Sequence, residues 1–431
     1  MPTPDQSRPA DPTRRHERAA VELGSTTVAP VTARVLVTGF LAALAVVPAI
    51  EATGVPALVH ESFVDRQLPG GGQPGAGVWR RLVAGNRAVL AGFTGFERAL
   101  EHESRLGQWL RPPTQALLTG RLGAGNERVY PGRDGWLFYR ADVEYVTGPG
   151  FLNPAVLRRR VRSASEWETP PRPDPRPAIV QFADDLAARG ITLIVMPVPL
   201  KPGVHPEQLA ATVEVPAGVL HNPSYASLLD DLGREGLVVF DPSAALAEAR
   251  RTAAAYLQTD THWRPETMEV VAGQLAAFIR ATVTLPDVVA PDVRIDRVEV
   301  ANTGDTARML DLADGSLLFP PESVWLRRIL GADGALWAST RGADVLLLGD
   351  SFSNIYSLAS LEWGTSAGLA EQLSYTLGRP LDRIIRNDDG AFATRELLVQ
   401  DPGRLEGTRV VVWQFATREL AFGDWKVLPL R

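Results

Sequence analysis

Four short segments of this chain consist almost entirely of apolar residues, without polar residues at alternate positions. They are ITLIVMPVP at 191–199, LVVFD at 237–241, DVLLLGD at 344–350 and RVVVWQF at 409–415. A strand with one face in solvent alternates apolar and polar side chains, whereas a central strand of a parallel sheet is apolar on both faces. These runs therefore predict a central, mainly parallel sheet that is covered on both faces.

Segments with the apolar spacing of helices lie between these runs, at 178–189, 225–235, 266–281 and 367–378. Strands that alternate with helices are typical of an α/β domain with a layer of helices on each side of the sheet. In this architecture, reactive groups gather at the carboxyl ends of the strands. The residues that follow the apolar runs are therefore the first candidates for a functional site.

The composition is that of a globular protein and excludes several kinds of partner and catalytic group. Of the 431 residues, 45% are apolar and 22% are charged, and the net charge is −6. We expect no nucleic-acid partner, because phosphate contacts need clustered Lys and Arg. The chain has no Cys and only six His, which excludes thiolate ligands and a Cys nucleophile. We expect no metal, since no second His or Cys stands at ligand spacing near His262.

The N-terminal segment predicts a tail and a membrane anchor. Residues 1–33 are polar and rich in Pro, Thr and Arg, which indicates a disordered cytoplasmic tail. The uncharged apolar run 35–50 follows, with Arg residues before it and Glu51 after it. This asymmetry places the N-terminus inside and the rest of the chain outside the cytoplasm. We predict a single-pass signal anchor over 34–52 in the cell membrane, with a cleaved signal peptide or a buried helix as the alternatives.

The following residues predict a connecting region and one large domain. Gly and Pro are dense over 62–78, as in a linker, and helical spacing continues to about Gly120. Residues 53–125 are therefore predicted to form a linker and a helical stem. The large domain is predicted to cover 126–431.

The apolar run at 344–350 ends in Gly349-Asp350-Ser351, and a helix can follow it. This geometry lifts a serine hydroxyl to the carboxyl edge of the sheet. It also points backbone N–H groups at the start of the helix toward developing negative charge. The alternative is that Asp350 and Ser351 only cap the helix.

A second polar motif contains Asp260 and His262, on a loop before Pro265, a residue that suits the first turn of a helix. Asp260 can accept a hydrogen bond from one imidazole nitrogen and leave the other nitrogen as a base. The alternative is a helix cap beside an exposed histidine. Together with Ser351, the motif supplies a Ser-His-Asp triad, which is defined by geometry rather than by chain order.

The order of these motifs, Asp260-x-His262-Trp263 first and Gly349-Asp350-Ser351 later, resembles the alginate O-acetyltransferase family of AlgJ and AlgX proteins. Further similar segments are VYPGRDGWLFY at 129–139, VMPVPLKPGVHPEQL at 195–209, NTGDTARML at 302–310 and VVVWQFATREL at 410–420. The resemblance implies an SGNH-hydrolase-like three-layer α/β/α fold with circularly permuted motif order. It also implies that Ser351 is the nucleophile, His262 the base and Asp260 the orienting acid.

The resemblance further implies an activity and partners. The expected reaction transfers acetyl groups to hydroxyls of an exopolysaccharide or cell-surface glycan, through acetyl-serine and without a cofactor. A membrane-bound O-acyltransferase is the expected acetyl donor. The chain resembles AlgJ more than AlgX, since no room for a further carbohydrate-binding module is expected before Arg431. The rivals are an acetylesterase, which shares the triad and differs in water exclusion, and a catalytically silent polysaccharide-binding subunit.

Several other residues are candidates for substrate or oxyanion binding. Trp263 is predicted either to stack on a sugar ring or to pack in the core, and Lys201 to line the cleft after a strand end. Asn354 and Asn387 are alternative candidates for the asparagine that helps to bind the oxyanion in SGNH proteins. Gly349 and Asp350 are the remaining candidates, because they adjoin the predicted nucleophile.

Overall fold

The computed structural model describes residues 29–51, 104–164, 169–212, 215–387 and 390–430, together with isolated positions between 85 and 95. The predicted tail up to residue 28 and the predicted linker at 62–78 lie outside the described residues. The chain divides into two compact units, Met1–Leu110 and Arg111–Arg431. The predicted start of the large domain, at 126, lies within the second unit.

Two helices lie in the region for which an anchor and a stem were predicted. Helix α2 (Pro30–Glu51) covers the apolar run, and α5 (Arg105–Leu122) lies where helical spacing was recognised. Among the described residues, no helix combines the length and the apolarity that a membrane crossing requires.

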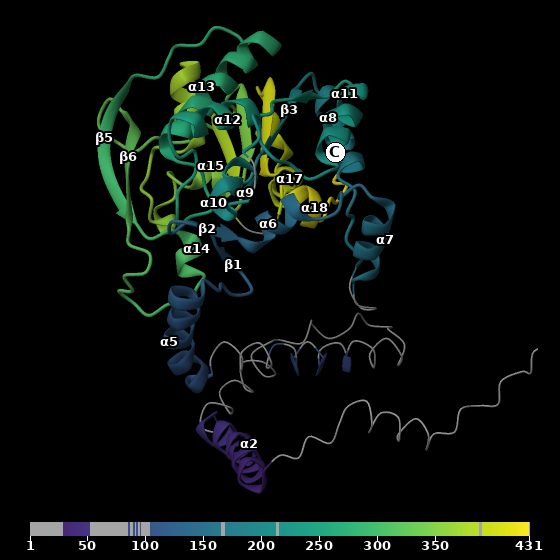
Figure 1. Ribbon diagram of the computed structural model, residues 1–431. Coiled ribbons are helices and arrows are strands. Elements are labelled where there is room, and N and C mark those ends of the chain that lie inside the picture. The colour runs from purple at the N-terminus through teal and green to yellow at the C-terminus, as the bar shows by residue number, and fades with distance from the viewer. Residues whose placement is uncertain are drawn as a thin grey trace, which may run out of the picture. The chain divides into compact units, whose positions relative to one another are not determined.

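A five-stranded parallel sheet forms the centre of the second unit (Figure 1). Its strands, in spatial order, are β4 (Val238–Val239), β3 (Thr192–Val198), β9 (Val410–Ala416), β7 (Val345–Gly349) and β8 (Asp382–Ile385). Four of them are the predicted apolar runs. The sequence did not reveal β8, because this edge strand alternates buried and half-buried residues over only four positions.

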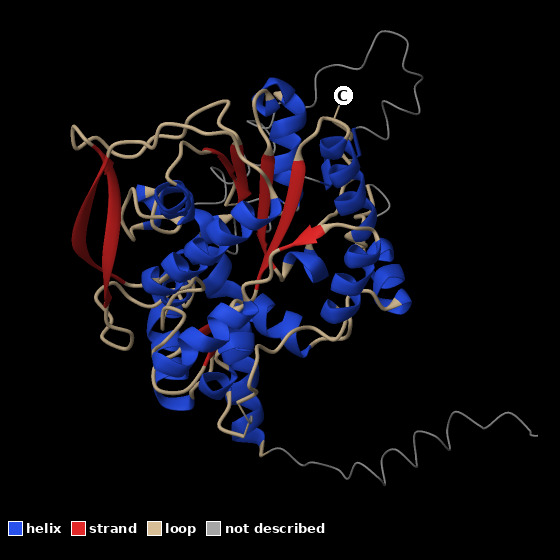
Figure 2. Cartoon of the chain, turned by 90° about the horizontal axis from the view of Figure 1, so that it is seen from above, coloured by secondary structure: helices blue, strands red, loops and turns tan. Residues whose placement is uncertain are grey.

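Helices lie on both sides of this sheet, so the domain has the predicted three-layer α/β/α architecture (Figure 2). The four predicted helices are α8 (Arg176–Ala187), α11 (Tyr225–Arg234), α13 (Pro265–Thr282) and α16 (Leu369–Leu377). Further helices are α6 (Arg140–Thr147), α7 (Pro154–Arg162), α9 (Lys201–Val204), α10 (Pro206–Leu209), α12 (Ser243–Thr252), α14 (Asp305–Arg308), α15 (Ser351–Asn354), α17 (Phe392–Gln400) and α18 (Glu419–Phe422). Two short 3₁₀ helices complete the set at Ala359–Leu361 and Pro402–Leu405.

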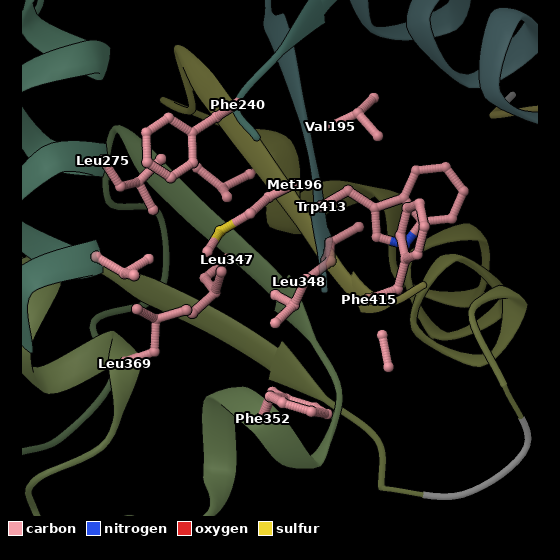
Figure 3. Close-up of a cluster of buried hydrophobic side chains, with 14 of the residues drawn as sticks. Val195, Met196, Phe240, Leu275, Leu347, Leu348, Phe352, Leu369, Trp413 and Phe415 are labelled. Carbon is pink, nitrogen blue, oxygen red and sulfur yellow. The ribbon is translucent and has the colours of Figure 1, made fainter. Parts of the chain in front are cut away.

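The core lies on both faces of the sheet (Figure 3). Val195, Leu348 and Trp413 pair in register across three adjacent strands and therefore share one face. Trp413 meets the ring of Phe182 on α8 edge to face, with centroids 5.4 Å apart. Leu347 lies toward the opposite face, as Figure 3 shows. Because apolar side chains cover both faces, polar groups collect at the strand ends.

Two antiparallel ribbons accompany the sheet. Strands β1 (Val129–Pro131) and β2 (Leu137–Tyr139) form a short hairpin from the segment VYPGRDGWLFY. Strands β5 (Val293–Asn302) and β6 (Glu322–Gly331) form a longer ribbon with ten paired positions. The sequence analysis did not predict either ribbon.

Candidate active site

The position of Ser351 follows from how β7 ends. All five residues of β7 are buried, and the strand stops at Gly349, where an added Cβ would lie 2.5 Å from Ser353 Oγ. Only glycine tolerates this approach. Asp350 then caps α15 by accepting a hydrogen bond from the backbone N–H of Phe352. Ser351 therefore begins a helical turn at the carboxyl edge of the sheet.

Ser351, His262 and Asp260 form one hydrogen-bonded chain. His262 Nε2 lies 2.8 Å from Ser351 Oγ, and His262 Nδ1 lies 2.6 Å from Asp260 Oδ1. The backbone N–H of His262 also donates to Asp260 Oδ1 at 3.1 Å. With the proton on Nδ1, Nε2 can accept the hydroxyl proton of Ser351. The structure thus brings together the three residues that the sequence singled out, although Ser351 lies 89 positions after His262.

The second oxygen of Asp260 is also occupied. Asp260 Oδ2 accepts from Trp363 Nε1 at 2.9 Å and from the backbone N–H of Asp305 at 3.0 Å. Gly304 makes the second contact possible, because a Cβ at this position would lie 2.1 Å from the carbonyl oxygen of Thr259. A buried carboxylate with both oxygens hydrogen-bonded is held in one orientation, and it holds the imidazole in turn.

Asp260 and His262 stabilise each other's charged form. Burial raises the pKa of Asp260, but the charge of His262 and hydrogen bonds from His262, Asp305 and Trp363 outweigh it, so the pKa lies below the ordinary value. Burial lowers the pKa of His262, but the charge and hydrogen bond of Asp260 together with the charge of Asp305 outweigh it, so the pKa lies above its ordinary 6.5. The pair is therefore suited to carry the imidazolium that forms during proton transfer.

Asp305 is a third acidic group beside the imidazole. Its Oδ2 lies 3.9 Å from His262 Nδ1, and its oxygens accept hydrogen bonds from the backbone N–H and the hydroxyl of Thr261. Asp260, His262 and Asp305 offer ligand atoms within 4.8 Å of one another, a spacing compatible with a cation. The same atoms already make the hydrogen bonds that orient a triad, and this arrangement accounts for the cluster.

The prediction that Lys201 lines the cleft is wrong. The side chain is 1% exposed, and Nζ donates to the backbone carbonyls of Leu137, Gln258 and Asp260 at 2.6, 2.8 and 3.0 Å. Burial lowers the pKa of Lys201 to about 8, against the opposing effect of nearby acidic groups. Lys201 therefore ties the loop of Asp260 to β2. The three carbonyls match the three donors of the ammonium group.

Trp263 packs in the core, which is the second of its two predicted roles. The side chain is fully buried, and Nε1 donates to the backbone carbonyl of Phe352 at 3.1 Å. Its ring meets the ring of Phe352 edge to face at 5.4 Å. The stacking of Trp263 on a sugar is therefore excluded, because neither face of the indole reaches the surface.

A small pocket of about 40 Å³ opens beside Ser351, and Asn387 lines it. Asn354 does not line this pocket; its amide donates to Asn387 Oδ1 at 3.2 Å. Within the described part of the chain, the backbone N–H of Ser351 donates to no other group. Asn387 and this N–H are therefore the better placed of the predicted oxyanion donors. Asn354 contacts the pocket only through its hydrogen bond to Asn387.

Asp350 and Gly349 also line the pocket, but neither supplies a side-chain donor. Asp350 accepts from Gln414 Nε2 at 2.7 Å and from the backbone N–H of Ala416 at 2.7 Å, in addition to its cap contact. Gln414 Oε1 accepts from Asp350 N and from Ser353 Oγ. The carboxylate of Asp350 thus fastens the serine turn to β9, and a contact of Asp350 or Gly349 with the substrate stays a prediction.

A second serine contacts a histidine and an aspartate elsewhere in the domain. Ser243 Oγ lies 2.9 Å from His221 Nε2 and donates to Asp241 Oδ1 at 2.5 Å. Here the serine lies between the two partners, so the aspartate cannot orient the imidazole as a base for that serine. The order of contacts, and not the residue types, singles out Ser351.

The sequence analysis assigned no role to several residues that build this site. Asp305, Trp363, Gln414 and Arg418 contact the triad, the serine turn or the pocket. Three of them lie in segments already noted for their resemblance, NTGDTARML at 302–310 and VVVWQFATREL at 410–420. The resemblance of these segments could have marked the residues as candidates. It could not predict which side chain or backbone group each of them contacts.

Comparisons with known proteins identify the family of this chain. Residues 129–417 match the family model described as "SGNH hydrolase-like domain, acetyltransferase AlgX". The "Probable alginate O-acetylase AlgJ" of Pseudomonas aeruginosa is 30% identical over 308 residues, which are 69% of this chain and 71% of that protein. The protein of the same name from Azotobacter vinelandii is 26% identical over 349 residues, 78% of this chain and 82% of the relative.

A solved structure shares the fold. The O-acetyltransferase domain of Pseudomonas putida AlgJ superposes with a TM-score of 0.51 at 23% identity, covering 68% of this chain and 92% of that one. The family model covers more than half of the chain, from the first hairpin to the residue after β9, and includes Asp260, His262 and Ser351. The chain therefore belongs to the AlgX family of acetyltransferases with an SGNH hydrolase-like domain.

Proposed function

We propose that this protein is an O-acetyltransferase that carries an acetyl group on Ser351 and passes it to a hydroxyl of an exopolysaccharide or cell-surface glycan. The observation that supports this most strongly is the unbroken chain of hydrogen bonds from Ser351 through His262 to Asp260. A silent binding subunit would have no need for a histidine held in this tautomer by a buried carboxylate. The names of the relatives, which refer to alginate O-acetylation, support the substrate class.

In the first step, His262 Nε2 takes the hydroxyl proton while Ser351 Oγ attacks the carbonyl carbon of an acetyl donor. The carbonyl oxygen becomes negative and is stabilised by the N–H of Ser351 and by Asn387. The intermediate then loses the donor's alcohol, which takes the proton from His262. The pocket of about 40 Å³ offers room for a few water-sized groups, which is the size of an acetyl unit.

In the second step, a sugar hydroxyl gives its proton to His262 Nε2 and attacks the acetyl-serine. The new ester leaves with the sugar, and Ser351 recovers its proton from His262. Water competes at this step, because it can attack the same carbonyl. Transfer and hydrolysis therefore share all the residues described above and differ in what occupies the acceptor position.

Transfer is tested by supplying both acceptors at once. We expect the enzyme, incubated with a chromogenic acetyl ester and glycan oligosaccharides, to produce sugars that are heavier by one acetyl, because a bound sugar outcompetes water by its proximity. Product masses and released acetate are measured together. If acetate is the only product with every acceptor, and an acetylated glycan loses its acetyl groups, the protein is an esterase instead.

The proposal includes a place in the cell. The apolar run 35–50 and the preceding arginines support a membrane anchor with the domain outside the cytoplasm. Cytoplasmic acetyl donors are not accessible there, so we propose that a membrane-bound O-acyltransferase supplies the acetyl group. We expect the full chain to sediment with membranes and a chain that begins at residue 79 to stay in the supernatant. A C-terminal reporter that works only in the cytoplasm should be silent, and its activity would overturn this topology.

A further inference from the structure

Arg418 lies in the wall of the pocket beside Ser351 and has no role in the chemistry described so far. It lies two residues after the end of β9 and directly before α18. It lines the pocket together with Ser351, Asn387 and Gln414. Its guanidinium carbon lies 6.0 Å from the ring centroid of Phe352, the residue after the nucleophile. A permanent cation thus lies next to the residues that would carry out acyl transfer.

A buried carboxylate holds Arg418 in place. Arg418 Nη1 donates to Asp142 Oδ1 at 3.0 Å, and the Asp142 side chain is 1% exposed. Burial raises the pKa of Asp142, and the charge of Arg418 opposes this increase. The other oxygen of Asp142 is buried without a hydrogen-bond partner among the described residues. Such a carboxylate is costly unless a cation stays beside it, so Asp142 keeps Arg418 charged and fixed.

The other nitrogens of this guanidinium are not used. For Nε and Nη2 of Arg418, the described residues provide no hydrogen-bond acceptor, and neither atom is sealed from solvent. Two other side chains of the pocket already have hydrogen-bond partners. Gln414 binds Asp350 and Ser353, and Asp350 also accepts from the backbone N–H of Ala416. In this pocket Asp350 and Gln414 bind each other, whereas Arg418 brings unpaired donors and a full charge.

The charge of Arg418 acts on the catalytic histidine. It opposes the effect of Asp260 on the imidazole, and so acts against an increased pKa of His262. Burial lowers the pKa of Arg418, but the charges of Asp142, Asp350 and Glu419 outweigh this, so the group remains a cation. In acyl transfer, the charge that develops within the pocket is negative and lies on the carbonyl oxygen. Fixed donors aimed at such an oxygen provide one of the largest contributions to catalysis.

We propose that Arg418 is a catalytic residue whose free guanidinium N–H groups donate to the carbonyl oxygen of the acyl group at Ser351 and stabilise its negative charge in both tetrahedral intermediates. This inference rests on the proposed acyl transfer. As the bond between Ser351 Oγ and the carbonyl carbon forms, the electron pair of the C=O double bond moves to the oxygen, beside the guanidinium. The pair returns when the alcohol leaves, and Arg418 keeps all its protons throughout.

The test uses the full chain with 4-nitrophenyl acetate. We expect Arg418→Ala to lower kcat by about 10² to 10³ with little change in KM, because a donor used only in the transition state is lost. Added guanidinium ion, at concentrations that leave the wild type unaffected, should restore part of this rate in a saturable way. Arg418→Lys should recover little, since an ammonium lacks the planar set of donors.

Arg404 offers a matched control. It also pairs with a fully buried aspartate, Asp382, and its side chain is 24% exposed against 18% for Arg418. Arg404 does not line the pocket beside Ser351. Arg404→Ala should keep kcat within about twofold and should not respond to guanidinium, since it removes a structural ion pair of similar burial.

Each result decides the question. A folded Arg418→Ala protein that keeps its kcat, or that loses rate without recovery by guanidinium, overturns the inference. An effect confined to KM for uronate acceptors also overturns it, because Arg418 would then bind the acceptor's carboxylate. If Arg418→Ala does not fold, Arg418→Lys, which keeps the charge beside Asp142, takes its place, and a kcat at the wild-type level in that variant overturns the inference. Wild-type turnover that disappears in Ser351→Ala shows that the proposed function stands, whatever Arg418 does.

Discussion

Replacing Ser351 with alanine is expected to abolish ester turnover, with a loss on the order of 10⁴ to 10⁶ in kcat, because removal of a nucleophile from a triad leaves only the oxyanion donors and binding. The fold should survive the change. Ser351 is half-buried, and its hydroxyl contacts only His262 among the described residues. The measurement is the initial rate on a chromogenic acetyl ester, with thermal unfolding of both proteins recorded in parallel.

Ser243 supplies the control for this prediction. It also contacts a histidine and an aspartate, but its hydroxyl donates to Asp241 and leaves His221 without an orienting carboxylate. Ser243→Ala should therefore keep the full rate. Its loss of a partly buried hydrogen bond is expected to lower the free energy of unfolding by about 1 kcal/mol. Full activity in Ser351→Ala, or loss of activity in Ser243→Ala, would show that the nucleophile has been assigned to the wrong serine.

Asp260→Asn is expected to lower kcat by about 10³ to 10⁴, because the amide no longer fixes the tautomer of His262 that accepts the serine proton. Asp260 Oδ2 accepts from Trp363 Nε1 and from the backbone N–H of Asp305, so the amide oxygen of Asn is expected to take this position. Its nitrogen then faces His262 Nδ1 and donates to it, which places the imidazole proton on Nε2. Rate measurements on the same acetyl ester give the loss directly.

The pH profile separates this role from simple damage to the fold. Burial lowers the pKa of His262, but Asp260, with a smaller contribution from Asp305, raises it above 6.5. Below that pKa the imidazole is protonated and cannot act as a base, so wild-type activity should fall as the pH falls through it. In Asp260→Asn the residual activity should persist to lower pH, since the largest contribution that opposes burial is then lost and the pKa of His262 falls. An acid limb that does not move would contradict the assignment of Asp260 as the partner of His262.

The contacts of Asp260 also explain why the segment 302–306 lies beside the triad. Gly304 admits the backbone of this segment against Thr259, and Asp305 then donates its N–H to Asp260. Asp305 also binds the backbone and the hydroxyl of Thr261. The segment therefore holds the triad loop together with Lys201, which donates to backbone carbonyls of the loop.

Local patterns in the sequence were sufficient to predict four of the five strands of the sheet, four of the helices that cover it and the three triad residues. A strand buried on both faces must be apolar throughout, so β3, β7 and β9 stand out without knowledge of their neighbours. Ser351 follows β7 directly, and Asp260 lies two residues before His262. In each case the physical requirement acts over a few neighbouring residues, so a single stretch of sequence reveals it.

Only the tertiary structure decided what the remaining polar residues do. Lys201 and Trp263 follow a strand end and the catalytic loop, where a substrate contact was plausible, yet both are buried. Their orientation depends on segments that are distant in sequence, since Lys201 meets a carbonyl 64 positions away and Trp263 one 89 positions away. Arg418 finds Asp142 across 276 positions. Hydrogen-bond partners across such separations follow from how the layers pack, and no local pattern encodes that packing.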